Sequence, residues 1–211
     1  MSPTRLRWFL VPAAACAALA GFRLAAELDR EAPQLASGTW LPVAKPVAEF
    51  HLIDNLGKPY TREQLTGAPT LVYFGFTRCP DVCPTTLIKL AQLRRQAALG
   101  SLRVLFVTVD PQRDTPPVLG LYVHAFDPSF QGVTGAPEEI RRVAANFAVA
   151  VNRVDLPGGD YTMDHSAVVF LLDAGARIVA VFTPPFDVRA FAADLRRAAP
   201  FLTPRRGWQL R

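Results

Sequence analysis

Two closely spaced cysteines are the residues of this chain best suited to chemistry. Cys79 and Cys83 lie in the segment YFGFTRCPDVCPTTL, and their spacing is CxxxC, not the CxxC of ordinary thiol oxidoreductases. The extra residue gives two soft sulfur donors room to converge on a metal and still lets them close into a disulfide. We interpret the pair as a redox pair, a metal site or both. A static structural disulfide is disfavoured, because such a short loop constrains little chain entropy.

The elements around the cysteines predict a strand-to-helix junction. Residues 70–76 form a near-continuous apolar run rich in β formers, which is typical of a buried central strand. Pro84 suits the first turn of a helix that should end before Gly100. Free amides at the helix start should stabilise both thiolates and lower their pKa values. Cys79, predicted to be the more exposed, would attack a disulfide and Cys83 would resolve it.

A third candidate ligand is His165, in the segment YTMDHSAVVFLLD, which we expect on a loop just before a strand. Two thiolates and one imidazole make a three-coordinate soft set that suits Cu(I), and Cu(II) accepts the same ligands with added oxygen or nitrogen. Asp164 is either a tuning carboxylate or a solvated turn residue, and Met163 is expected to pack. We leave His51 and His124 out of the site because they fall in an edge hairpin and inside a helix.

The segment FVTVDPQRDTP joins a second buried strand, residues 102–109, to a helix. We expect Asp114 or Thr115 to cap this helix and Arg113 to pair with a carboxylate. Asp110 follows a parallel strand at its carboxyl end, the edge where α/β folds place their sites. Its role stays open at this stage.

The order of the predicted elements indicates an α/β fold of the thioredoxin-like type. We expect a central mixed sheet flanked by helices, with an inserted helix and an N-terminal edge hairpin. The remaining elements follow from apolar periodicity and turn residues. They are a hairpin near residues 50–57, helices over 115–126 and 137–149, strands over 167–172 and 177–182, and a helix from Val188 capped by Asp187.

The charge distribution argues against nucleic-acid binding. The chain has a net charge of +5, yet residues 45–204 contain 16 Lys and Arg against 15 Asp and Glu. The excess lies in the two ends, and no basic helix interleaved with aromatics is present in the sequence. A membrane partner fits this distribution better, because basic residues flank an apolar segment at the N-terminus.

Four segments divide the chain. Residues 1–28 are predicted to be a signal anchor, with a cleaved signal peptide as the alternative. Residues 29–46 are predicted to be a linker, 47–202 the folded domain and 203–211 a basic tail. Arg5 and Arg7 on the cytoplasmic side would anchor the chain in the inner membrane with its domain facing the periplasm. Two thiols in that oxidising compartment are expected to be functional.

Three motifs resemble the Sco/SenC family of copper chaperones for cytochrome c oxidase assembly. They are GFTRCPDVCPTTL, VTVDPQRDTP and YTMDHSA, in the family's order, within a similarity that covers residues 47–200. The resemblance implies a membrane-tethered domain that binds copper, as Cu(I) or Cu(II), through Cys79, Cys83 and His165. It also implies partners: cytochrome c oxidase subunit II, and other periplasmic copper carriers or thiol reductants.

Two functions remain open within this resemblance. One is copper delivery to the binuclear centre of the oxidase, and the other is reduction of that centre's cysteines by a thiol-disulfide oxidoreductase for which copper is incidental. A peroxidase on the same fold is disfavoured. Peroxiredoxins need a Thr three residues before the attacking cysteine and a Pro further upstream, where this chain has Phe76 and Val72.

Overall fold

The computed structural model describes residues 32–96 and 101–203 of the chain. The predicted anchor, the predicted stop at Gly100 and the basic tail beyond Thr203 lie outside the described residues. Within them, no helix combines the length and apolar character needed to cross a membrane. The helices are α2 (Val82–Gln96), α3 (Pro116–His124), α4 (Pro137–Asn146) and α5 (Val188–Ala198), with short 3-10 turns η1 (Arg62–Leu65) and η2 (Ala199–Phe201).

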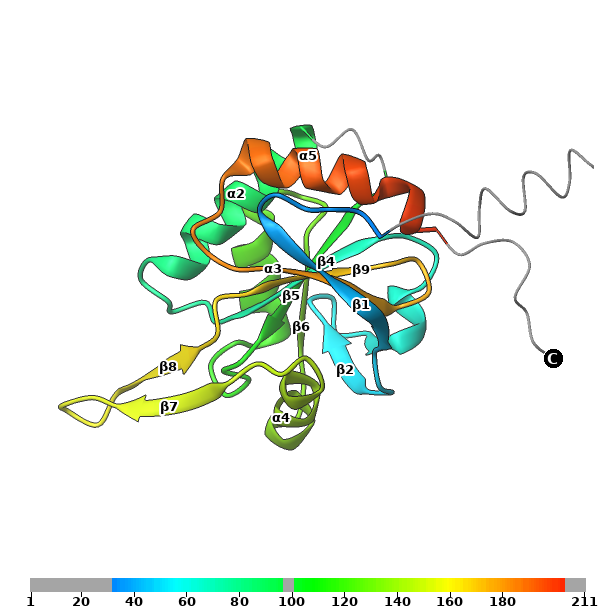
Figure 1. The fold of residues 1–211 in the computed structure, drawn as a ribbon. Helices are drawn as coiled ribbons and strands as arrows, with labels where there is room; N and C mark the ends of the chain where they lie inside the picture. Colours follow the sequence, from blue (N-terminus) through cyan, green and yellow to red (C-terminus); the bar gives the residue numbers. More distant parts are fainter. Residues whose placement is uncertain (1–31, 97–100, 204–211) are drawn as a thin grey trace, which may run out of the picture. The chain divides into compact units, whose positions relative to one another are not determined.

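The strands form one large sheet and one small one (Figure 1). The large sheet has the order β1-β10-β9-β4-β5-β6-β2-β3, and β7 and β8 pair with each other in a separate two-stranded sheet. The strands are β1 (Gly38–Pro46), β2 (His51–Asp54), β3 (Pro59–Thr61), β4 (Thr70–Gly75), β5 (Arg103–Thr108), β6 (Gln131–Thr134), β7 (Val151–Asp155), β8 (Tyr161–His165), β9 (Val169–Leu172) and β10 (Arg177–Phe182).

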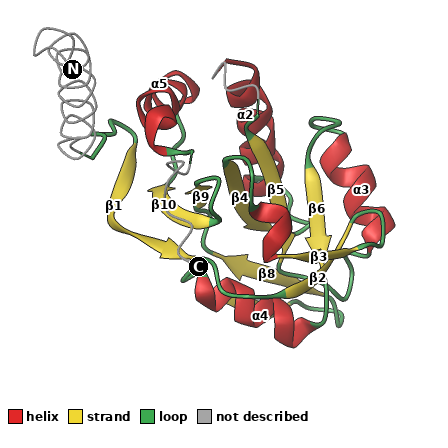
Figure 2. Cartoon of the chain, turned by 90° about the vertical axis from the view of Figure 1, so that its right-hand side faces the viewer, coloured by secondary structure: helices red, strands yellow, loops and turns green. Residues whose placement is uncertain are grey.

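The large sheet is mixed and is covered by helices on both faces. β4, β5 and β6 are parallel, and the other pairings are antiparallel. α2 and α5 pack against each other, and α4 lies on the opposite side of the sheet from them (Figures 1 and 2). This arrangement confirms the predicted thioredoxin-like architecture, including the edge hairpin of β2 and β3.

The two central strands bring two candidate loops to one edge of the sheet. All six residues of β4 are buried, as the apolar run predicts. β4 pairs with β5 in parallel, and Gly75 lies opposite Thr108 at the end of both strands. The loop that carries Cys79 and the loop that carries Asp110 therefore leave the sheet side by side.

The second half of the predicted linker forms part of the sheet. Residues 38–46 form β1, which pairs with β10 at the sheet edge, with an irregularity between Trp40 and Lys45. An edge strand tolerates proline, because its outward N–H groups need no partner. The preceding residues are also held, since the Asp194 carboxylate on α5 accepts hydrogen bonds from the amides of Ala36 and Ser37 at 2.9 and 2.7 Å.

The strands β7 and β8, here called the arm, were not predicted. They form a hairpin that projects from the large sheet (Figure 1). Its turn contains Gly158 and Gly159, both with a φ of +86°, a conformation that favours glycine. β7 is largely exposed and polar, so it lacks the apolar alternation by which a half-buried strand is recognised.

Candidate metal centre

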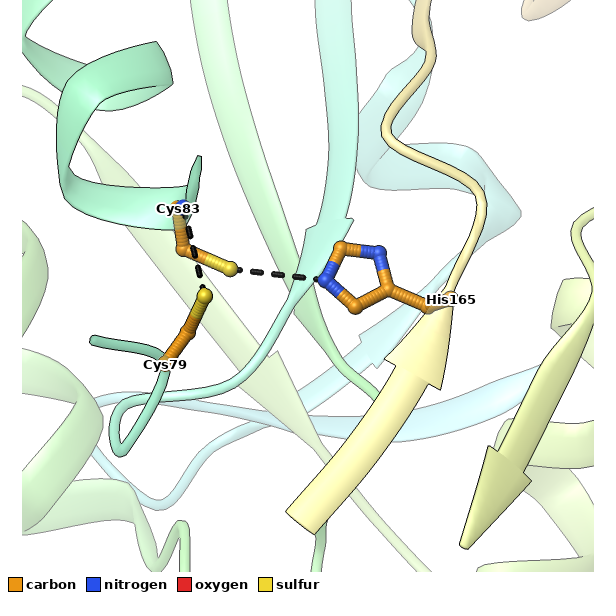
Figure 3. A group of neighbouring side chains, drawn as sticks. All are labelled: Cys79, Cys83 and His165. Atoms are coloured by element: carbon orange, nitrogen blue, oxygen red, sulfur yellow. Dashed lines mark hydrogen bonds between the residues drawn. The ribbon is translucent and has the colours of Figure 1, made fainter. Parts of the chain in front are cut away.

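The structure brings the three predicted ligands together from three separate segments (Figure 3). Cys79 lies in the loop after β4, Cys83 in the first turn of α2, and His165 is the last residue of β8. Their ligand atoms all lie within 4.8 Å of one another. Within this group the Cys83 Sγ lies 3.4 Å from the His165 Nε2, and the Cys83 amide donates to the Cys79 Sγ at 3.4 Å.

A glycine in β4 makes room for the inner cysteine. A Cβ added to Gly75 would lie 2.9 Å from the Cys83 Sγ and 2.8 Å from a ring carbon of Phe106. Both distances are shorter than side-chain carbons tolerate, so a larger residue here would push the sulfur away from the sheet. Cys83 is fully buried, whereas Cys79 is half-buried, which confirms that Cys79 is the more exposed of the two.

The predicted lowering of the thiol pKa values is wrong for Cys83. Burial, reinforced by the neighbouring Cys79, raises the pKa of the Cys83 thiol to about 12. Backbone amides at the helix start still stabilise the thiolate, but the loss of hydration around a fully buried sulfur destabilises the thiolate by more. A bound cation reverses this balance, because metal coordination deprotonates a thiol.

We expect the two cysteines of the metal-free, reduced protein to differ strongly in alkylation rate. At pH 8, a pKa of about 12 leaves only about one Cys83 thiolate in ten thousand. Iodoacetamide should therefore modify Cys79 first, and Cys83 should become reactive as the pH rises toward its pKa. Peptide mass spectrometry after timed labelling measures both rates, with the denatured chain as the reference. Equal rates at pH 8 in the folded protein would contradict the burial of Cys83.

His165 is held in the form that binds metals. Burial lowers the pKa of its imidazole below the ordinary 6.5, so the ring is neutral at pH 7. Its Nδ1 lies 3.3 Å from the Ser166 carbonyl oxygen. A proton donated there leaves the Nε2 lone pair directed at Cys83. The rings of Tyr73 and Phe76 lie edge-on to the imidazole, with centroids 6.2 and 6.0 Å away.

The neighbours of His165 on β8 do not join the ligand group. Asp164 is exposed, and alternation along the strand directs it away from the face that carries His165. Met163 is half-buried and packs against the hydrophobic core, as predicted. His51 lies in β2 and His124 at the end of α3, and neither belongs to the group. The loop predicted for His165 is in fact the end of a strand.

Asp114 connects the two loops at the sheet edge. Its fully buried carboxylate accepts hydrogen bonds from the Thr77 amide at 3.0 Å, the Thr77 hydroxyl at 2.6 Å and the Thr108 hydroxyl at 2.6 Å. Thr115 occupies the N-cap position of α3, as predicted, but makes no side-chain cap hydrogen bond, and Asp114 has the different role just described. Arg113 pairs with the Asp110 carboxylate, as predicted. Asp114 therefore fixes the loop that carries Cys79.

The donor set suits one soft metal ion. Ligand atoms about 2.0–2.3 Å from a common ion lie less than about 4.6 Å apart. The three ligand atoms lie within 4.8 Å of one another, so small side-chain movements would bring them into a single coordination sphere. Two sulfurs and one imidazole nitrogen favour copper or zinc over hard cations such as Mg²⁺. The fold and the site together define a thioredoxin-like domain with a Cys, Cys, His metal centre.

Comparison with known proteins identifies the family. The family model described as SCO1/SenC matches residues 42–200, which is most of the chain. The chain belongs to the SCO1/SenC family.

Individual relatives agree with this assignment. The mitochondrial SCO2 homologue of Danio rerio is 40% identical over 136 residues, which cover 62% of this chain and 49% of that protein. The chain thus spans about half the length of this relative. The copper-bound structure of ScoI from Bradyrhizobium japonicum has a TM-score of 0.66 at 40% identity, covering 72% of this chain and 98% of that one. Copper-bound yeast Sco1 has a TM-score of 0.69 at 32% identity, covering 79% and 96%.

Proposed function

We propose that this protein is a copper metallochaperone that assists assembly of the binuclear copper centre of cytochrome c oxidase. The convergence of Cys79, Cys83 and His165 within 4.8 Å carries the proposal. Two thiolates with a neutral imidazole form a soft, low-coordinate set that suits Cu(I). The copper-bound relatives from Bradyrhizobium japonicum and yeast, which share the fold at 40% and 32% identity, support copper as the ion.

The three ligands would have different parts in loading and release. Copper, as cargo, would displace the proton of Cys83, while His165 is already neutral and has none to lose at Nε2. Of the two sulfur ligands, Cys79 is half-buried and Cys83 is buried, and His165 is half-buried like Cys79. A client cysteine can therefore approach on the Cys79 side and take over the ion by stepwise ligand exchange.

We place the domain on the periplasmic side of the inner membrane, with residues 1–28 as its anchor. The support is the sequence pattern of Arg5 and Arg7 before an apolar segment. The proposed client is cytochrome c oxidase subunit II, and other periplasmic copper carriers or thiol reductants would load or reduce the site. In that oxidising compartment a pair of thiols tends to form a disulfide, so a thiol reductant would be needed to keep the site able to bind copper.

A thiol-disulfide oxidoreductase is the second candidate function. It is favoured by the contact between the Cys83 amide and the Cys79 sulfur at 3.4 Å and by the exposure of Cys79. The Cys79 thiolate would attack a client disulfide and form a mixed disulfide, releasing one client thiolate. Cys83 would then attack Cys79 and release the second client thiolate. The client gains two electrons, and the Cys79–Cys83 pair is oxidised to a disulfide.

We expect the reduced full-length protein, purified in detergent, to bind one Cu(I) per chain. The three ligand atoms fill one coordination sphere, so a second equivalent should remain with a chromogenic Cu(I) chelator in a competition titration. The matched control is the Cys79→Ser, Cys83→Ser double variant, which should leave all copper with the chelator. Copper retained by that double variant, or a wild-type stoichiometry near zero, would refute the proposed site.

A further inference from the structure

The arm carries a metal ligand but is not part of the large sheet. In the described part of the chain, β7 and β8 form a ladder only with each other, from Val151 opposite His165 to Asp155 opposite Tyr161. A two-stranded hairpin is marginally stable by itself. The placement of His165 beside the cysteines therefore depends on what fastens the arm to the domain.

Tyr161, at the end of β8 opposite His165, adds polar contacts to the packing of Val151 and Met163 against the hydrophobic core. Its hydroxyl donates to the Asp110 Oδ1 at 2.8 Å. The guanidinium carbon of Arg113, which follows β5, lies 3.7 Å from the centroid of its ring, and that of Arg153, which belongs to β7 of the arm itself, lies 3.8 Å from it. Two cations at these distances cannot occupy the same face, so the ring is held between them. Arg113 also donates to the Tyr161 carbonyl oxygen at 2.9 Å and to the Asp160 carboxylate at 3.1 Å.

The partners of Tyr161 are themselves fixed. Asp110 is only 3% exposed, pairs with Arg113, and its amide donates to the Thr108 hydroxyl at 2.9 Å. The same hydroxyl donates to Asp114, which holds the Cys79 loop through Thr77. One hydrogen-bond network thus links the loop that carries a sulfur ligand to the loop that holds the arm.

We propose that Tyr161 is a positioning residue for the metal ligand His165, an inference that rests on the proposed function. The two residues are four apart on one strand, so their side chains share a face, and the strand carries the constraint over about 13 Å. If the arm is released, the imidazole samples positions away from the cysteines. The apparent copper affinity is then the affinity of the fully formed site multiplied by the fraction of time that the imidazole is in place.

Tyr161 is not placed to bind the ion itself. Its side chain contacts the Asp110 carboxylate and two guanidinium groups. The ligand group consists of Cys79, Cys83 and His165 and does not include it. Direct and indirect action can therefore be separated by a double-mutant cycle. If Tyr161 acts through the imidazole, its removal should matter only while the imidazole is present.

The experiment uses full-length protein with Tyr161→Ala, Tyr161→Phe and His165→Ala, singly and with the tyrosine changes in the His165→Ala background. We expect Tyr161→Ala to weaken Cu(I) binding about tenfold, because it removes both the hydrogen bond to Asp110 and the ring that lies between the two arginines. Tyr161→Phe loses only the hydrogen bond and should have a smaller effect, about threefold. In the His165→Ala background, Tyr161→Ala should change the affinity less than about twofold. Val154→Ala, on the outer face of the arm, is the matched control and should have no effect.

A second readout requires no metal. Amide hydrogen exchange in residues 151–155 and 161–165 should accelerate in Tyr161→Ala, while β4 and β5 stay protected. Unchanged exchange in the arm would overturn the inference, as would an equal loss of copper affinity with and without His165. If His165→Ala alone leaves copper binding intact, the proposed site fails. If His165 matters and Tyr161 does not, only the positioning role fails.

Discussion

Replacement of His165 with alanine is expected to lower Cu(I) affinity about a hundredfold or more while disulfide formation between Cys79 and Cys83 continues. Loss of a residue that merely supports a metal ligand typically costs 10–100-fold in affinity, so loss of a ligand should cost at least as much. The Cys83 sulfur would lose its neighbour at 3.4 Å, and the ion would retain two sulfurs. Oxidation of the pair needs only those sulfurs.

The measurement combines chelator competition for Cu(I) with the thiol-disulfide potential of the same preparation. His124→Ala is the matched control, because His124 is an exposed histidine at the end of α3. Unchanged copper affinity in His165→Ala would show that the ligand assignment is wrong. When it is expressed in a host whose own copy of the protein has been deleted, His165→Ala also distinguishes the two proposed functions. Restored oxidase assembly by a form that cannot hold copper would favour the reductase.

The site could be predicted from the sequence because its parts carry strong local signals. The apolar run of β4, the proline after Cys83 and the CxxxC spacing together place two sulfurs at a helix start. His165 is a candidate from its position just before a predicted strand, and the three motifs, in the order of the Sco/SenC family, support it as the third ligand. The fold followed from the alternation of buried strands and amphipathic helices in the chain.

The arm shows where sequence reasoning failed. β7 buries almost nothing, so its pairing with β8 is set by the hairpin turn and by contacts to a distant loop. Tyr161 and Asp110 are 51 residues apart in the chain, and nothing local marks them as partners. A lone aromatic beside a glycine-rich turn is too common a pattern to indicate a structural clamp.

The direction of the Cys83 pKa shift could not be predicted for a related reason. A helix start is a local feature and favours the thiolate, whereas burial is a property of the assembled domain. The Cys83 sulfur lies against Gly75 of β4, and this closeness is visible only in three dimensions. The edge strand β1 is similar, since its prolines indicate a linker until β10 provides a partner.

Replacement of Cys83 with serine is expected to have the largest effect of any single ligand change. Cys83 is the central member of the group, adjacent to the His165 Nε2 at 3.4 Å and, through its amide, to the Cys79 Sγ at 3.4 Å. Cys83→Ser leaves two ligands from different segments and should reduce Cu(I) affinity about a thousandfold or more, because a hydroxyl is a poor ligand for a soft ion. The disulfide between Cys79 and Cys83 can also no longer form.

Cys79→Ser is the matched comparison, since both serine variants abolish the disulfide. This variant keeps Cys83 and His165, whose ligand atoms lie 3.4 Å apart. Cu(I) accepts two ligands, so Cys79→Ser should bind copper more tightly than Cys83→Ser. Thermal unfolding serves as the control for stability, because a serine hydroxyl buried without a partner costs about 1–3 kcal/mol. The reverse order of affinities, at equal stability, would show that the imidazole binds beside Cys79 rather than Cys83. Both serine variants should fail to restore oxidase assembly whichever function is correct, so the choice between copper delivery and cysteine reduction depends on comparing them with His165→Ala.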